Sequence, residues 1–257
     1  MANEEVLVTY EDGLQIITFN RPKKLNSIPL STYESLTEAL KEAVKRDDVK
    51  MTVVTGAGAY FSAGNDFSNP FSDDMEGTLR KNLGVLSKYI NTLIDHPKLL
   101  VAIVNGPAVG IAVTMLSLFD LIYASESATF HTPFSSLGLC AEGCSSYMFP
   151  RLLGTSLAAK MLYFNYKMSA KEAKETGFVA ELFNDNSLPK IYQDLKSYTK
   201  LPLNSLMTSK RLIRMSDRQA LKAVNAFEQE ALVERFLSED FLNAMMEMMS
   251  KRSKSKL

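Results

Sequence analysis

The sequence predicts an α/β fold in which strands alternate with helices before a block of helices ends the chain. Short β-branched or apolar runs at residues 51–55, 100–104 and 121–124 are separated by segments whose apolar residues recur at helical spacing. From about residue 188 onward the pattern is helical only. Residues 99–150 contain no Lys or Arg although 23% of the chain is charged, so this segment should form the interior. A chain of 257 residues can bury one large core.

The first quarter of the chain predicts a hairpin, a helix and a buried strand. Strands are expected at residues 6–10 and 14–19, joined by a turn that contains Asp12-Gly13. Ser31 and Glu34 have the spacing of a capping box, which predicts the start of a helix that runs to about residue 45. After the strand at 51–55, a second helix is indicated by apolar residues at alternating four- and three-residue steps, Leu79, Leu83, Leu86, Ile90 and Leu93.

The middle of the chain continues the alternation. After the strand at 100–104, we expect a buried helix at 110–118, strands at 121–124 and 129–130, and a helix that starts near Glu142. Ser169 and Glu172 form a second capping box, whose helix ends at Gly177 before a strand at 179–183. We therefore divide the chain into a core over residues 1–190 and a helical region over residues 191–257.

Composition excludes several classes of function. The chain has 29 basic and 29 acidic residues, so its charge favours no nucleic-acid partner. No run reaches the roughly 18 apolar residues of a membrane helix, and the first residues lack the features of a secretory signal. Cys140 and Cys144 form one isolated C-x3-C pair, which with only two histidines predicts no metal site. Phosphate-loop, nucleophile-elbow and complete dinucleotide-binding motifs are missing from the sequence.

The last three residues match a targeting signal. Ser255-Lys256-Leu257 is the tripeptide that the peroxisomal import receptor reads at a free C-terminus. The sequence therefore predicts a protein of the peroxisomal matrix.

Glu142 is the candidate for chemistry in the interior segment 99–150, whose only other carboxylates are Asp120, at the start of an expected strand, and Glu126, in an expected turn. Its sequence neighbours are apolar or small, and no cation is close to it in sequence. A carboxyl buried in such surroundings has a raised pKa, which suits a group that accepts and returns a proton near neutral pH. The same position also fits a partly solvated glutamate near a helix N-terminus, stabilised by the helix dipole.

Two loops combine a glycine with the end of a buried strand. They cover residues 62–66 and 107–111. Glycine in such a loop lets the backbone approach a ligand and point N–H groups into a pocket. Two of these N–H groups converging on one carbonyl oxygen would form an oxyanion hole. Ordinary strand-to-helix turns explain the same spacing, and the sequence alone does not decide between the two.

Four motifs together resemble the crotonase (enoyl-CoA hydratase/isomerase) superfamily. They are Asn20-Arg21-Pro22, the segment Phe61-Ser62-Ala63-Gly64-Asn65-Asp66-Phe67, the segment Val104-Asn105-Gly106-Pro107-Ala108-Val109-Gly110, and Asp120-Leu121-Ile122-Tyr123-Ala124. The resemblance implies a spiral of ββα repeats, with the acyl-CoA site in the core. It also implies a C-terminal helical region that builds a homotrimer, or a hexamer of paired trimers.

The resemblance further implies a site for an acyl-CoA thioester. Its carbonyl oxygen would accept hydrogen bonds from the backbone N–H groups of Asn65 and Ile111. The CoA and acyl portions would lie along the loop over residues 23–27 and along the two glycine-containing loops. The residues are Lys23, Lys24, Leu25, Ser27, Ala63, Gly64, Asn65, Asp66, Phe67 and Gly110. No cofactor is expected, because CoA is part of the substrate.

The acidic residues narrow the reaction that the resemblance implies. Hydratases of the family carry two glutamates, and this chain has Thr114 and Phe134 at the corresponding positions. The lone acid Glu142 and its surroundings resemble the peroxisomal Δ3,Δ2-enoyl-CoA isomerase branch. That branch implies a single base, Glu142, which moves a proton from C2 to C4. A dienoyl-CoA isomerase, which needs two acids, and a non-catalytic acyl-CoA-binding protein of the same fold remain the alternatives.

Overall fold

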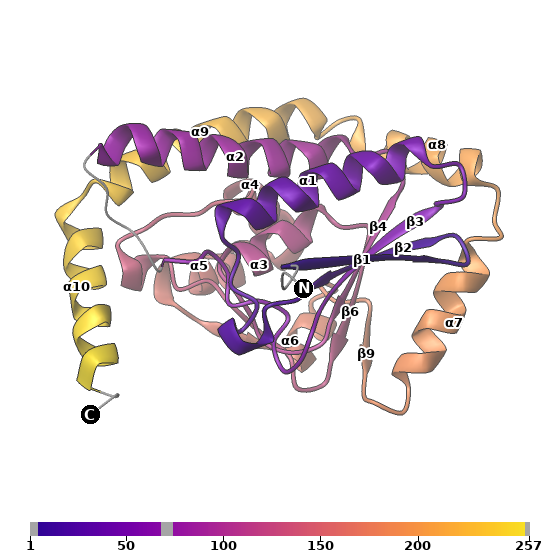
Figure 1. Ribbon diagram of the computed structural model, residues 1–257, viewed down its shortest axis with the longest axis horizontal. Helices are drawn as coiled ribbons and strands as arrows, with labels where there is room; N and C mark the ends of the chain where they lie inside the picture. Colours follow the sequence, from indigo (N-terminus) through magenta and orange to yellow (C-terminus); the bar gives the residue numbers. More distant parts are fainter. Residues whose placement is uncertain (1–4, 68–73, 255–257) are drawn as a thin grey trace.

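The larger of two sheets runs through the middle of the molecule. A computed structural model describes residues 5–67 and 74–254 (Figure 1). The sheet has the order β1-β2-β3-β4-β6-β9, in which β1 and β2 are antiparallel and every other neighbouring pair is parallel. These strands are β1 (Val6–Glu11), β2 (Leu14–Phe19), β3 (Met51–Gly56), β4 (Leu99–Val104), β6 (Leu121–Ser125) and β9 (Glu181–Phe183).

The predicted spiral is confirmed by the second, smaller layer of extended chain. Its strands are β5 (Ala108–Val109), β7 (Thr129–His131) and β8 (Lys167–Ser169), in the order β5-β7-β8. Two isolated bridges, Ile28 to Asn65 and Ser62 to Ala108, continue this layer towards the start of the chain. Each turn of the spiral thus leaves the large sheet, crosses the second layer and returns through a helix. The crossing segments include both glycine loops.

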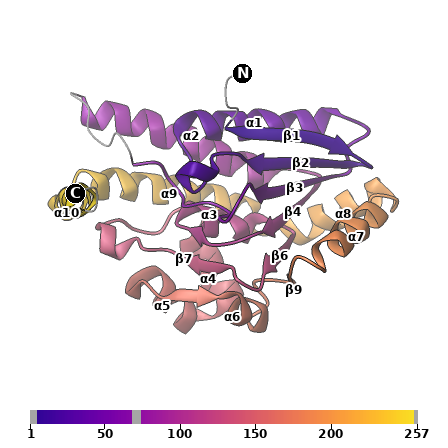
Figure 2. The same ribbon diagram turned by 60° about the horizontal axis from the view of Figure 1, so that its bottom comes forward.

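Both faces of the large sheet are covered, which explains the near-continuous apolar strands. Helices α1 (Leu30–Lys45) and α2 (Met75–Asp95) cover one face, and α7 (Leu188–Tyr198) lies on the other (Figures 1 and 2). Neighbouring residues alternate between the faces. Val54 belongs to the larger buried cluster, whereas Val53 packs in the cluster that α7 completes with Ile191.

The remaining helices are short in the middle of the chain and long at its end. They are η1 (Pro22–Lys24), α3 (Ile111–Thr114), η2 (Met115–Leu118), η3 (Ser135–Leu137), α4 (Ser145–Leu153), α5 (Thr155–Phe164), α6 (Ala170–Glu175), α8 (Leu203–Arg214), α9 (Arg218–Phe236) and α10 (Glu239–Lys254). Helix α9 packs along α2, where the Asn225 side chain donates to the Ser87 carbonyl oxygen (3.1 Å). No helix in the described part of the chain is long and apolar enough to cross a membrane.

The hairpin and the second capping box are confirmed. Asp12 and Gly13 both have positive φ (47° and 84°), as the tight turn of a hairpin requires. At the start of α6, the Ser169 hydroxyl accepts a hydrogen bond from the Glu172 backbone N–H, and the Glu172 carboxylate accepts one from the Ser169 N–H. Both motifs depend on neighbouring residues alone.

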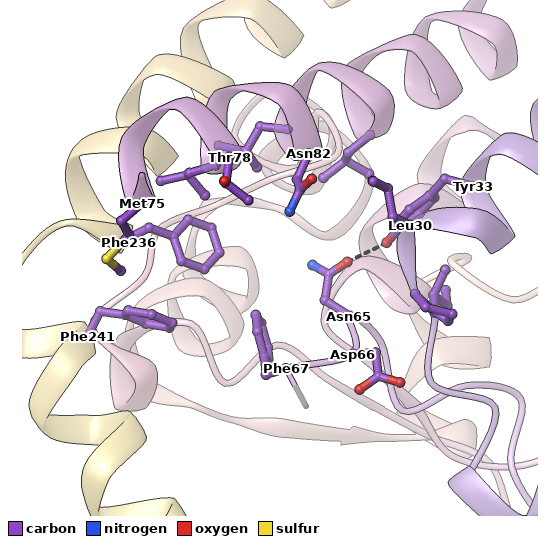
Figure 3. A pocket seen from close by; sticks show the side chains of 15 residues that line it. Leu30, Tyr33, Asn65, Asp66, Phe67, Met75, Thr78, Asn82, Phe236 and Phe241 are labelled. Carbon is purple, nitrogen blue, oxygen red and sulfur yellow. Dashed lines mark hydrogen bonds between the residues drawn. The ribbon is translucent and has the colours of Figure 1, made fainter. Parts of the chain in front are cut away.

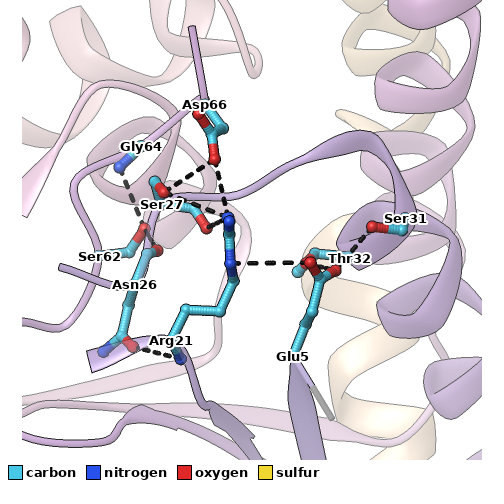
Figure 4. Close-up of polar contacts among 9 residues, drawn as sticks. All are labelled: Glu5, Arg21, Asn26, Ser27, Ser31, Thr32, Ser62, Gly64 and Asp66. Carbon is cyan, nitrogen blue, oxygen red and sulfur yellow. Dashed lines mark hydrogen bonds and ion pairs between the residues drawn. The ribbon is translucent and has the colours of Figure 1, made fainter. Parts of the chain in front are cut away.

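Three local predictions are corrected. The capping box at Ser31 is wrong, because α1 begins at Leu30 and the Ser31 hydroxyl donates to the Glu5 carboxylate (2.6 Å; Figure 4). The helix expected at 110–118 is four α-helical residues followed by a 3-10 helix. The helix expected near Glu142 starts at Ser145 and ends at Leu153, and Gly154 separates it from α5, which begins at Thr155.

Candidate active site

The Glu142 carboxyl is buried at the end of a tight turn. Only 4% of Glu142 is exposed. Gly143 and Cys144 follow it with φ of 65° each, and the Ser145 N–H and hydroxyl both donate to the Glu142 carbonyl oxygen (3.2 and 2.8 Å). A Cβ atom on Gly143 would lie 2.7 Å from the Thr114 hydroxyl oxygen, so this position requires glycine. The turn is therefore pressed against α3, and the partly solvated interpretation of Glu142 is wrong.

Burial controls the charge of Glu142. The pKa of this carboxyl is raised to about 8: desolvation is the largest cause, the nearby Glu228 carboxyl adds to it, and the hydrogen bond from Asn65 opposes both. The Asn65 amide nitrogen lies 3.3 and 3.4 Å from the two carboxyl oxygens. No ion pair reaches Glu142 among the described residues. The carboxyl therefore has the proton affinity of a group that exchanges a proton near neutral pH.

Tyr33 of α1 orients the Asn65 side chain. The Tyr33 hydroxyl donates a short hydrogen bond to the Asn65 side-chain oxygen, which leaves the amide nitrogen facing Glu142. Burial raises the pKa of Tyr33 well above its usual value, so the hydroxyl keeps its proton. The hydrogen bonds from Tyr33 to Asn65 and from Asn65 to Glu142 link α1 to the second layer of the spiral.

The two glycine loops, residues 62–66 and 107–111, contact each other beside these hydrogen-bonded side chains. A Cβ atom on Gly64 would lie only 2.5 Å from the Val109 carbonyl oxygen, and one on Gly110 would lie 3.9 Å from the Glu142 Oε1 atom. Gly64 and Gly110 both have positive φ, 81° and 60°. Ile111 is the first residue of α3, so its N–H belongs to the first turn, where a helix offers no internal acceptor. The structure thus brings the two glycine loops and Glu142 together.

A largely apolar pocket of about 170 Å³ opens next to Asn65 (Figure 3). The rings of Phe67, Phe236 and Phe241 gather at one end, with centroids 6.2 Å apart for Phe67 and Phe236 and 4.8 Å apart for Phe236 and Phe241. Asn65 and Tyr33 lie at the other end, below helix α2. Ligand sites of this kind combine apolar walls with a few polar groups that fix orientation.

The loop expected to hold CoA divides into exposed and internally bonded residues. Lys23, Lys24 and Leu25 are exposed, so the two ammonium groups are accessible to anionic groups. Ser27 and Asp66 instead bond to each other, the Ser27 hydroxyl donating to the Asp66 carboxylate at 3.1 Å (Figure 4). The Ala63 N–H donates to the Leu25 carbonyl oxygen (2.9 Å) and so joins this loop to the first glycine loop.

Comparison with known proteins places the chain in a family. The sequence pattern of enoyl-CoA hydratase/isomerase matches residues 9–255. The chain belongs to this family. Enoyl-CoA delta isomerase 2 from Rattus norvegicus is 49% identical over 97% of the chain, and enoyl-CoA delta isomerase 3, peroxisomal, from Mus musculus is 44% identical over 99%. The chain spans 64% of the length of the rat protein and 81% of the mouse protein.

The fold of the family is confirmed by solved structures. An enoyl-CoA hydratase/isomerase from Pseudoalteromonas atlantica superimposes with a TM-score of 0.87 at 27% identity, covering 96% of this chain and 98% of that one. Thr114 and Phe134, which the resemblance predicts to stand where hydratases carry glutamates, are both buried. The described residues contain no group of three or more His, Cys, Asp or Glu that could hold a metal ion.

Several residues at the candidate site were not predicted from the sequence. Arg21 lies in the motif Asn20-Arg21-Pro22, but nothing in the sequence indicated its ion pair with Asp66 (2.8 Å). Phe236 and Phe241 come from the last two helices and reach the pocket only through folding. Glu228 did leave a signal, because it falls at helical spacing with Leu221 on the buried face of α9, where a charged residue is unusual.

Proposed function

We propose that the chain is a Δ3,Δ2-enoyl-CoA isomerase, which converts 3-cis- or 3-trans-enoyl-CoA to 2-trans-enoyl-CoA in the β-oxidation of unsaturated fatty acids. The observation that carries the proposal is the buried Glu142 carboxyl, held by Asn65 beside two touching glycine loops. The names of the rat and mouse relatives support the same reaction.

The reaction requires one base and one pair of hydrogen-bond donors. Ionised Glu142 removes a proton from C2, and the electron pair of the C–H bond delocalises over the dienolate to the thioester oxygen. The N–H groups of Asn65 and Ile111 stabilise that oxygen, and one lost donor of this kind costs about 3 kcal/mol. The neutral Glu142 carboxyl then returns the proton to C4, which restores the carboxylate. Only a proton moves, so the reaction needs no cofactor.

The rest of the substrate fits the surroundings. Lys23 and Lys24 offer cations to the phosphates of CoA, and the loop from Leu25 to Ser27 and the segment 63–67 line its path. The aromatic pocket accepts the apolar acyl chain. We place the protein in the peroxisomal matrix on the basis of Ser255-Lys256-Leu257, which lies outside the described residues. Region 191–257 would build the homotrimer, or a hexamer, of the family.

The test is the variant Glu142→Gln. We expect it to lose most turnover of 3-hexenoyl-CoA, because an amide cannot accept the C2 proton, while calorimetric binding of a saturated acyl-CoA survives. Glu126→Gln, in an exposed turn, is the matched control. Wild-type turnover by Glu142→Gln would contradict the proposal. Binding without turnover of 3-enoyl or 3,5-dienoyl esters by the wild type would favour the non-catalytic alternative, and turnover of the dienoyl ester alone the dienoyl-CoA isomerase.

A further inference from the structure

A second buried carboxyl lies on the other side of the Glu142 turn. Glu228 belongs to α9, and only 6% of it is exposed. One of its oxygens accepts the Cys144 backbone N–H (2.7 Å), and the other accepts the Ser146 N–H (2.9 Å) and hydroxyl (2.5 Å). Each carboxylate oxygen thus faces a main-chain donor from the segment that follows Glu142.

These bonds cap helix α4 from outside. Cys144 is the N-cap of α4, but its thiol is directed to the Leu221 carbonyl oxygen (3.4 Å) rather than to the helix. Glu228 supplies the acceptors that an N-cap side chain would otherwise provide, and its negative charge suits the positive end of the helix dipole. The turn at Gly143 and Cys144 is therefore fixed between α9 and α3, with Glu142 at its leading end.

The charges around the two carboxyls are few among the described residues. Burial raises the pKa of Glu228, and its hydrogen bonds to Ser146 and Cys144 oppose that shift. The Arg235 guanidinium, also on α9, donates to the Gly138 carbonyl oxygen and pairs with Asp240. From the other elements, the Cys140 thiol is near both carboxyls, the Cys144 thiol is near Glu228 and the Tyr33 hydroxyl is near Glu142. Burial raises the pKa of each of these three groups, so all are neutral at physiological pH.

We propose that Glu228 is a positioning residue for the reaction at Glu142: it fixes the turn that presents the Glu142 carboxyl, and its charge acts on that carboxyl. The proposal rests on the isomerase function proposed above. Both carboxyls are buried and joined through the same short turn, so a negative charge on Glu228 raises the proton affinity of Glu142. Ionised Glu228 makes Glu142 a stronger base, which is the property that proton removal from C2 demands.

The experiment compares Glu228→Gln and Glu228→Asp with a matched control. Gln keeps the size of the side chain but removes the charge and one acceptor, whereas Asp keeps the charge and withdraws it by one methylene. Glu230→Gln is the control, because Glu230 lies two residues away on the same helix and pairs with Arg80 at the exposed surface. Two readouts are recorded for each protein: kcat and KM for 3-hexenoyl-CoA from pH 5 to 10, and the infrared titration of the Glu142 carboxyl, assigned by subtraction of Glu142→Gln.

We expect Glu228→Gln to lower the midpoint of the Glu142 titration and of the pH–kcat profile by about one pH unit, since a neighbouring negative charge is lost. Its plateau kcat should fall about tenfold with KM nearly unchanged, because a displaced base affects the chemical step. Glu228→Asp should keep the wild-type midpoint and lose a similar factor in kcat for the same reason. Glu230→Gln should match the wild type in both readouts.

The outcomes separate this inference from the proposed function. A Glu142 midpoint that stays at the wild-type pH in Glu228→Gln, or a wild-type kcat in Glu228→Asp, would overturn the role of Glu228 while Glu142 remained the base. If Glu142→Gln turned over substrate at the wild-type rate, the proposed role of Glu142 as the base would be contradicted. The infrared titration would still show whether Glu228 acts on Glu142, because it requires no substrate. If Glu228→Gln did not fold, Glu228→Asp would decide the proposal on kcat.

Discussion

The burial of Glu142 should make the protein less stable as the pH rises, and Glu142→Gln should remove this loss. The pKa of the carboxyl is raised from 4.5 to about 8 in the folded chain. Between these values the folded protein holds a proton that the unfolded chain has released, so the free energy of unfolding falls as pH increases. Each pKa unit is worth about 1.4 kcal/mol, which gives a total of roughly 5 kcal/mol above pH 8. The stability that proton binding by Glu142 contributes is fully present below pH 4.5, and it is lost as the pH rises through 8.

Urea denaturation of both proteins from pH 5 to 9, at one fixed protein concentration, measures this effect. The free energy of unfolding of Glu142→Gln minus that of the wild type should grow by about 1.4 kcal/mol per pH unit between pH 5 and 7.5, and then level off. Two stability curves that ran parallel across this range would refute the raised pKa. A base held neutral at the cost of stability is the expected compromise at an active site.

Two further predictions concern activity. In the free wild-type enzyme, kcat/KM should rise with pH through an apparent pKa of about 8, since only the ionised Glu142 removes a proton; steady-state rates across pH measure this, and a flat profile would contradict it. Tyr33→Phe removes the hydroxyl that orients the Asn65 amide, so kcat should fall roughly tenfold while the protein stays folded by circular dichroism; an unchanged kcat would show that Asn65 holds Glu142 without this hydrogen bond.

The predictable parts of the fold were those that neighbouring residues determine. Asp12-Gly13 supplied the two positive φ values of the hairpin, and the Ser169–Glu172 box formed because both partners lie in one turn. The Ser31 box failed because the distant Glu5 carboxylate competes for the same hydroxyl. The division of the chain at residue 190, within α7, stays a prediction.

The site follows the same rule. Glu142 was found because it is an acid with apolar neighbours in a segment without Lys or Arg. The glycine loops were found because they follow predicted buried strands. Tyr33, Phe236 and Glu228 reach the site from helices far apart in sequence. Helical spacing indicates that Glu228 is buried, but the partners of all three residues depend on packing that periodicity does not encode. Ser27 and Asp66 were expected to line the CoA path, but the structure shows that they also hold two loops together through Arg21.

The central claim is that one buried carboxyl carries the same proton from C2 to C4. It is tested most directly by a single turnover of 3-hexenoyl-CoA deuterated at C2, in ordinary water, followed by mass spectrometry and NMR of the product. Because Glu142 is shielded from solvent, we predict that a measurable fraction of the 2-trans product carries deuterium at C4. A C4 hydrogen drawn entirely from water would contradict a proton shuttle confined to Glu142.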